Sequence, residues 1–239
     1  MKGVNASALT WLVKGWRPVP RSRLLARWLF NIDFLDVGRG DQYFDVTTPL
    51  LVRAAARRLT RDSRVLDMGT GAFAVIGLAL WRRTGCKVVS TDIHPRILEQ
   101  ARANVELNQA PVRVLNSRFF DQLDEDFDVV VFNPPYIPSH LAQNPIYARP
   151  FDFQSNGGGE GTSVIEEFLD EFVARGGGAT ACLGMNELFV SGASVLALIA
   201  ARKGLALEQI DRFPGWPFYV LAIGRAPGAA EAPRPRRVD

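Results

Sequence analysis

Val65-Leu-Asp-Met-Gly-Thr-Gly71 combines an apolar run, one acidic residue and two glycines. The apolar part predicts a short buried strand, Val65–Met68, and a helix over Ala74–Arg83 follows the glycine turn. Glycine tolerates a positive φ and lets the backbone approach a ligand closely. A strand, a glycine turn and a helix in this order are typical of nucleotide-like cofactor sites. The segment therefore predicts a cofactor-binding turn.

The alternation of strands and helices continues along the chain. Strands are predicted at Lys87–Thr91, Val112–Leu115, Asp128–Phe132 and Ala179–Gly184, with helices at Pro49–Leu59, Pro95–Asn108, Ser163–Arg175 and Ala193–Lys203. Apolar strands that alternate with helices indicate an α/β fold, with a parallel sheet covered on both faces. The last two apolar runs, Leu207–Arg212 and Phe218–Ile223, are joined by a turn-rich segment and predict an antiparallel hairpin.

Two carboxylates narrow the choice of cofactor. Asp92 ends the second predicted strand, where its carboxylate can accept hydrogen bonds from both hydroxyls of a ribose. Asp67, at the end of the first strand, is expected to face a cationic group rather than a pyrophosphate. The amino group and sulfonium of S-adenosylmethionine have that polarity, so this is the cofactor that the two positions favour.

Val129-Val-Val-Phe-Asn-Pro-Pro-Tyr136 is the most informative stretch for the reaction. A buried strand ends in an asparagine, two prolines and a tyrosine. Proline has no N–H and fixes the backbone, which leaves carbonyl oxygens free to point into a pocket. The Asn133 side-chain oxygen and the Pro134 carbonyl can both accept hydrogen bonds from one –NH2 group, while Tyr136 can stack beside it. The stretch predicts methyl transfer to a nitrogen, with catalysis by positioning.

Together, Asp67–Gly71, the run Thr91-Asp-Ile-His-Pro95 and Asn133-Pro-Pro-Tyr-Ile-Pro138 resemble class I methyltransferases, most of all the HemK-like family that methylates a glutamine side chain of peptide release factors. The likeness covers roughly residues 41–225 and includes Gly157-Gly-Gly-Glu-Gly161. It implies a Rossmann-like fold with a mainly parallel seven-stranded sheet and a C-terminal antiparallel hairpin.

The resemblance also implies roles for individual residues. The residues implied to bind S-adenosylmethionine are Asp67, Gly69, Thr70, Gly71, Asp92, Ile93, Phe119, which would lie against the adenine, and Asn133. The catalytic residues would be Asn133, Pro134 and Tyr136, and Pro135 would join them in binding the substrate. No metal ion is expected.

Four features depart from the family pattern. Phe73 replaces the third glycine of the cofactor loop, so its side chain must turn away from the cofactor or reshape the pocket. Arg118 stands where an acidic residue is usual, and Arg149 stands where the family usually has glutamate. The N-terminal arm is shorter than the family's release-factor-binding domain.

Charge is distributed unevenly over three predicted parts of the chain. A helical arm, residues 1–40, holds seven Lys or Arg against two Asp, whereas the methyltransferase domain at 41–225 sums to −3. Residues 226–239 are rich in Ala, Pro and Arg and predict a disordered tail. The charge of the domain disfavours nucleic acid as a partner. No apolar run is long enough to cross a bilayer, and two widely spaced cysteines favour a reducing compartment, so we expect a cytoplasmic protein.

The residues leave the methyl acceptor open. A protein glutamine or similar amide is the leading acceptor, and a small-molecule amine or amide in a biosynthetic pathway is an alternative. The exocyclic amine of a nucleic-acid base is a third, because the same asparagine and proline groups suit it. A non-catalytic cofactor-binding module is a reading from another class, which Phe73 would support if its ring blocked the methionine site. The oligomeric state is not predicted.

Overall fold

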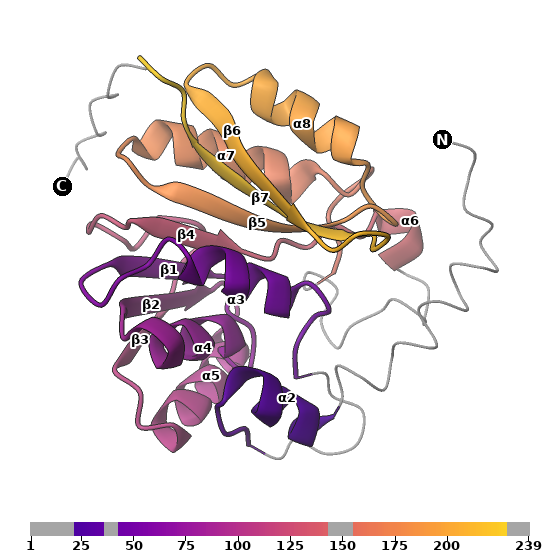
Figure 1. Ribbon diagram of the computed structural model, residues 1–239. Coiled ribbons are helices and arrows are strands. Elements are labelled where there is room, and N and C mark those ends of the chain that lie inside the picture. The colour runs from indigo at the N-terminus through magenta and orange to yellow at the C-terminus, as the bar shows by residue number, and fades with distance from the viewer. Residues whose placement is uncertain (1–21, 36–42, 143–154, 229–239) are drawn as a thin grey trace.

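A computed structural model describes residues 22–35, 43–142 and 155–228. Its centre is a seven-stranded sheet with the strand order β3-β2-β1-β4-β5-β7-β6 (Figure 1). The strands are β1 (Arg64–Met68), β2 (Lys87–Asp92), β3 (Val112–Asn116), β4 (Val129–Phe132), β5 (Thr180–Asn186), β6 (Leu205–Arg212) and β7 (Phe218–Arg225). The first five are parallel, and β7 runs antiparallel to both β5 and β6. The predicted parallel sheet and closing hairpin are confirmed.

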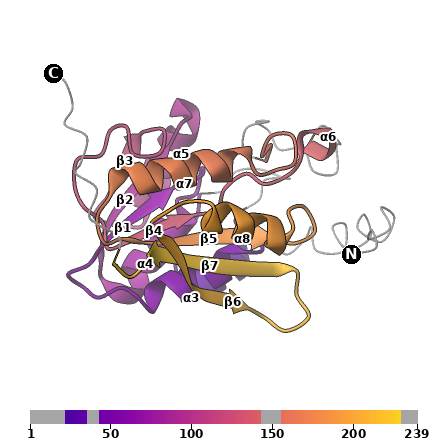
Figure 2. The same cartoon turned by 90° about the horizontal axis from the view of Figure 1, so that it is seen from above.

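Helices cover both faces of this sheet. They are α2 (Arg23–Phe30), α3 (Thr48–Ala56), α4 (Val75–Thr84), α5 (Pro95–Leu107), α6 (Ser139–Ala142), α7 (Ser163–Arg175) and α8 (Gly192–Ala200). Buried side chains of α2 to α5 form one apolar layer, and those of α7 and α8 form the other. Figure 2 shows α7 and α3 on opposite sides of β5 and β7. Alternate strand residues supply the two layers: Val65 packs in the first and Leu66 in the second.

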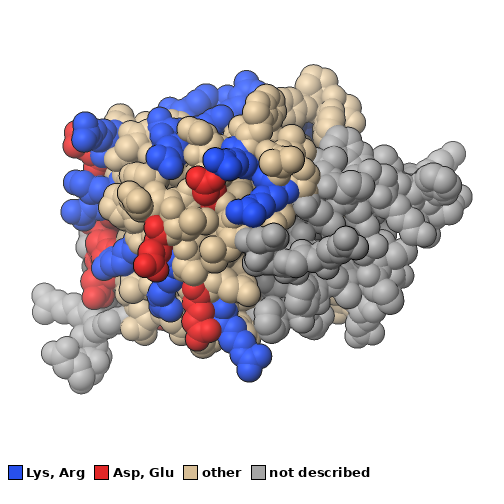
Figure 3. Space-filling view, turned by 90° about the horizontal axis from the view of Figure 1, so that it is seen from below, with Lys and Arg blue, Asp and Glu red and all other residues tan. Residues whose placement is uncertain are grey.

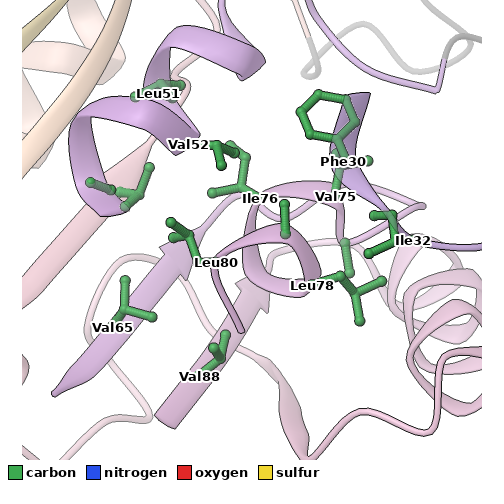
Figure 4. Close-up of a cluster of buried hydrophobic side chains, with 14 of the residues drawn as sticks. Phe30, Ile32, Leu51, Val52, Val65, Val75, Ile76, Leu78, Leu80 and Val88 are labelled. Carbon is green, nitrogen blue, oxygen red and sulfur yellow. The ribbon is translucent and has the colours of Figure 1, made fainter. Parts of the chain in front are cut away.

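The first layer is shown in Figure 4, where side chains of α3, α4 and β1 meet. Leu51, Leu78, Leu80 and Val65 are fully buried there. Burial of such side chains stabilises a fold by roughly 1.5–3 kcal/mol each. This layer fixes α3 and α4 against the strands whose carboxyl ends carry the predicted site.

Part of the predicted N-terminal arm lies on this layer. Helix α2 begins after Ser22, whose hydroxyl accepts a hydrogen bond from the Leu25 N–H, and Phe30 is buried at its end. Beyond it, Asn108 donates to the Asp33 carbonyl and accepts from the Asp33 N–H, at 2.7 and 2.8 Å. The segment 22–35 is therefore tied to the end of α5.

Other parts of the predicted arm and tail, residues 1–21, 36–40 and 229–239, lie outside the described residues, as does Arg149. None of the helices within 22–35, 43–142 and 155–228 is long and apolar enough to span a membrane. Cys86 and Cys182 are both buried and unpaired by any disulfide.

Strand order places the site. The chain moves from β1 outward to β2 and β3, and then returns to the other side of β1 with β4. In open α/β sheets, ligands bind outside the carboxyl ends of the strands at such a reversal. The ends of β1, β2 and β4 carry Gly69–Gly71, Asp92 and Asn133.

Candidate functional site

The glycine turn after β1 has the backbone geometry that its sequence predicts. Gly69 and Gly71 have φ values of 64° and 65°, in the left-handed region that favours glycine. A side chain added to Gly71 would meet no atom within 4 Å, so the outer side of the turn is open. The Thr70 N–H donates to the Thr91 carbonyl at 2.8 Å, which ties the turn to the end of β2. A ligand can therefore approach the backbone of this turn closely.

Asp67 lies in β1, two residues before Gly69, and its side chain is fully buried. Oδ2 accepts hydrogen bonds from the Thr70 hydroxyl at 2.5 Å, the Gly77 N–H at 2.9 Å and the Ser90 hydroxyl at 3.3 Å. Through this one oxygen Asp67 joins the turn to α4 and β2, and its interaction with the cationic group of a cofactor stays a prediction.

The environment of Asp67 changes its titration. Oδ1 is buried and has no hydrogen-bond partner among the residues of the structure described above. Burial raises the pKa of Asp67 to about 6, against the lowering effect of the hydrogen bonds from Thr70, Gly77 and Ser90. A cationic group bound on the other side of the turn would favour the ionised form.

Asp92 lies next to this turn at the end of β2. Its Oδ2 accepts from the Gly71 N–H and its Oδ1 from the His94 N–H, both at 3.1 Å. Burial raises the pKa of Asp92, and backbone hydrogen bonds oppose that shift. The following residue, Ile93, leaves 53% of its surface exposed. The fixed carboxylate and the exposed apolar side chain suit a ribose and a flat base respectively.

Phe119, which is predicted to lie against the adenine, packs against other aromatic rings of the core. The residue is buried, and its ring packs edge-on against Phe132 at 6.3 Å and at a tilt against Phe168 of α7 at 6.2 Å. The Arg118 guanidinium lies 4.8 Å over the same ring and pairs with Glu167 at 2.7 Å. Contact between Phe119 and an adenine stays a prediction, as does the effect of Arg118.

Phe73 turns away from the turn and into the core. Its ring lies 4.8 Å from that of Tyr43 and 5.9 Å from that of Phe34. Asn104 supports the same region, because it donates to the Ala72 carbonyl and accepts from the Leu35 N–H. The replacement of the third glycine therefore leaves the turn open, which argues against a module whose methionine site is blocked.

The loop after β4 is held by the glycine-rich segment. The Ile137 N–H donates to the Ser155 carbonyl at 2.9 Å, and the Gly157 N–H donates to the Ile137 carbonyl at 2.8 Å. Side chains at Gly157 or Gly161 would lie 2.8 Å from the Pro135 carbonyl oxygen or 2.4 Å from that of Tyr136. Only glycine permits this approach, so the segment Gly157–Gly161 positions the predicted acceptor site.

Within that loop, Pro134 is buried and Pro135 is half-buried. None of the described residues donates a hydrogen bond to the Pro134 carbonyl. Tyr136 is buried, and its ring stacks on Phe189 at 6.0 Å. Asn133 is half-buried, and its side-chain oxygen lies 3.0 Å from the Thr47 hydroxyl. The structure thus brings Asn133, Pro134 and Tyr136 together beside the glycine turn.

Three residues of this site escaped the sequence analysis. Phe189 follows β5 and stacks on the predicted tyrosine. Thr47 and Asp45 precede α3 and contact Asn133 and Tyr136 through hydrogen bonds. For Asp45 and Thr47 the only signal is Thr-Thr-Pro at 47–49, which marks a helix start without showing what the side chains bind.

Among the described residues, no group of three or more His, Cys, Asp or Glu could hold a metal ion.

Comparisons with known proteins find methyltransferases. The methyltransferase small domain family matches residues 40–151. A release factor glutamine methyltransferase of Lactococcus lactis is 28% identical over 130 residues, which cover 53% of this chain and 48% of that protein. The ribosomal RNA small subunit methyltransferase C of Haemophilus influenzae is 36% identical over 93 residues, 38% of this chain and 27% of that protein.

A solved structure extends the likeness over more of the chain. It is the E. cuniculi Mtq2–Trm112 complex, responsible for methylation of the translation termination factor eRF1; the match is 28% identical with a TM-score of 0.53 and covers 81% of this chain and 99% of that one. The chain spans about half the length of the L. lactis relative. The sheet order, the glycine turn and these matches lead to one conclusion: the chain has the fold of the class I S-adenosylmethionine-dependent methyltransferases.

Proposed function

We propose that this chain transfers the methyl group of S-adenosylmethionine to the –NH2 nitrogen of an amide, with a glutamine side chain of a release factor as the acceptor. The observation that carries the proposal is the Asn133–Tyr136 loop. It lies at the end of β4, beside the open glycine turn, and Gly157–Gly161 holds it in place. Its oxygen acceptors suit a group that donates two hydrogens.

The residues around the turn fit the proposed cofactor. Open space beside Gly71 leaves room for a ligand against the backbone, and Asp92 presents a carboxylate suited to two ribose hydroxyls. Asp67 accepts a hydrogen bond from Thr70 of the turn, and its ionised form has a negative charge that suits a cationic cofactor. S-adenosylmethionine would supply an electrophilic methyl group on a cationic sulfur.

On the acceptor side, the protein's own groups orient the substrate nitrogen, and none of them acts as a nucleophile. Asn133 and the Pro134 carbonyl accept hydrogen bonds from the –NH2 group and direct the nitrogen lone pair toward the methyl carbon. The Tyr136 ring, supported by Phe189, packs beside the planar amide. With the cofactor bound, the nitrogen–carbon bond would form as the sulfur–carbon bond breaks and leaves its electron pair on sulfur, and the nitrogen would then lose a proton to water. Positioning can supply a large part of such a rate enhancement.

The names of the relatives support a protein acceptor. The L. lactis protein is a release factor glutamine methyltransferase, and the E. cuniculi complex methylates a termination factor. The H. influenzae relative favours a second candidate, the exocyclic amine of a ribosomal RNA base. Residues 41–225 carry a net charge of −3, which opposes binding to a phosphate backbone. The protein acceptor is therefore the one we favour.

Asn133→Ala tests the chemistry. It removes one acceptor for the –NH2 group and leaves the glycine turn intact, so turnover should fall by about a hundredfold or more, far more than S-adenosylmethionine affinity falls. Turnover is followed with a methyl-labelled cofactor and a purified release factor, and affinity by calorimetry. Asn133→Asp is the companion, because it keeps an acceptor but adds negative charge near the sulfonium; it should slow methyl transfer without weakening cofactor binding. Near-normal turnover by Asn133→Ala would refute the proposal.

A further inference from the structure

Thr47 occupies an unusual position at the start of α3. Threonine before a helix usually caps a backbone N–H, but the Thr47 side chain caps none in the described part of α3. The residue is fully buried, and its Oγ1 lies 2.7 Å from Asp45 Oδ1 and 3.0 Å from Asn133 Oδ1. Its hydroxyl is therefore committed to a carboxylate on one side and to the proposed catalytic amide on the other.

The hydroxyl has one hydrogen and faces two acceptors. Asp45 Oδ1 is the stronger acceptor, because it is the nearer atom and a carboxylate attracts donors more strongly than an amide oxygen. The same Oδ1 also accepts from the Thr47 N–H at 2.9 Å, which holds the two residues in this arrangement. Once the hydrogen points at Asp45, only lone pairs of Thr47 Oγ1 face the Asn133 amide.

A lone pair of Thr47 Oγ1 that lies 3.0 Å from the Asn133 amide can form a hydrogen bond only if the amide donates to it. An amide group offers an oxygen on one side and an NH2 on the other, and hydrogen-bond partners decide which side faces which neighbour. We infer that Asp45 and Thr47 are positioning residues that set the Asn133 amide, with Nδ2 donating to Thr47 Oγ1 and Thr47 Oγ1 donating to Asp45. The inference rests on the proposed function, in which Asn133 accepts a hydrogen bond from the acceptor –NH2.

This orientation decides which substrates the site accepts. With Nδ2 held by Thr47, the amide oxygen faces away from Thr47 and can act together with the Pro134 carbonyl of the proposed function. Both groups then accept, so the site selects a group that donates two hydrogens. The opposite orientation would present an NH2 group and would favour a carbonyl. Asp45 also lies 3.5 Å from the Tyr136 hydroxyl, which donates to it, so one carboxylate supports both side chains of the acceptor site.

A double-mutant cycle tests the coupling. Thr47→Val removes the hydroxyl and keeps the branched shape, so kcat should fall by roughly ten- to a hundredfold while cofactor affinity stays within about twofold. In the Asn133→Ala background, the same change should have little further effect, because two residues that act as one unit are not additive. Thr47→Ser keeps the hydroxyl and should recover most of the turnover. Equal losses in both backgrounds, or normal kcat in Thr47→Val, would overturn the inference.

A second measurement needs no acceptor. The side-chain 15N–1H2 signals of Asn133, identified by their loss in Asn133→Asp, report directly on the amide. The inference predicts one proton protected from exchange in the unmodified chain, with that protection lost in Thr47→Val and kept in Thr47→Ser. Two freely exchanging protons in the unmodified chain would overturn it. If Asn133→Ala leaves turnover unchanged, the proposed function fails whatever the spectra show; if Asn133→Ala is inactive and the protection is absent, only the positioning role fails.

Discussion

Asp67 is a buried carboxylate whose pKa the fold raises strongly. Because burial raises its pKa from 3.8 to about 6, the folded chain binds a proton on Asp67 at pH values where the unfolded chain has released it. The free energy of unfolding should therefore fall as pH rises from about 4 to about 6, by about 3 kcal/mol from this group alone. Denaturant unfolding at several pH values measures the change.

Asp67→Asn isolates this contribution, since the amide keeps an oxygen for the Thr70 and Gly77 donors but does not titrate. The pH dependence should flatten in that variant. Asp62, an exposed carboxylate, gives the matched control Asp62→Asn, which should keep the slope of the unmodified chain. Parallel curves for Asp67→Asn and the unmodified chain would show that another group causes the dependence.

At the scale of elements, the segment before α7 fixes the acceptor loop. A methyl group at Gly157 would lie 2.6 Å from the Gly161 carbonyl oxygen and 2.8 Å from that of Pro135, so the loop after β4 must shift. Gly157→Ala should cost roughly 1–3 kcal/mol of stability and at least about tenfold in turnover, with cofactor affinity nearly unchanged. Gly159→Ala is the matched control, because a side chain at that exposed glycine would meet no atom within 4 Å.

Thermal melting measures the stability of the two variants, kinetic assays measure their turnover, and calorimetry measures their affinity for the cofactor. A Gly157→Ala protein that behaves like Gly159→Ala would mean that the glycine-rich segment does not position the loop.

The elements themselves could be predicted from local patterns. Apolar runs and glycine turns indicate the strands β1 to β5, and Pro49 marks the start of α3, as the structure confirms. Contacts between distant segments leave no such pattern. The sequence near Phe73 does not show that its ring will pack against Phe34 and Tyr43. Likewise, the sequence near Asp67 does not show that the Gly77 N–H will donate to its carboxylate. The sequence therefore predicts the loops that form the site. The partners of their side chains depend on how α2, α3 and α4 pack, which the sequence does not show.

For the whole molecule, charge separates the two macromolecular acceptors. Figure 3 shows one face on which Lys and Arg are interspersed with Asp and Glu. Over residues 41–225 as a whole the net charge is −3, which predicts weak binding to ribosomal RNA fragments. Each neutralised phosphate adds roughly −0.7 for a single strand to −0.9 for a duplex to the slope of log affinity against log salt, and we expect a slope of about −2 or shallower. Fluorescence anisotropy with a labelled RNA measures it, and tight binding with a steep slope would favour the RNA acceptor.

The central claim is methyl transfer to an amide nitrogen at the Asn133–Tyr136 loop. The most direct test is mass spectrometry of a release factor incubated with the full chain and S-adenosylmethionine. We predict one added methyl group on a glutamine side-chain nitrogen, stable to mild base and absent when Asn133→Ala replaces the unmodified chain. A methyl group on oxygen or carbon, an ester that mild base removes, or the same product from Asn133→Ala would contradict the account.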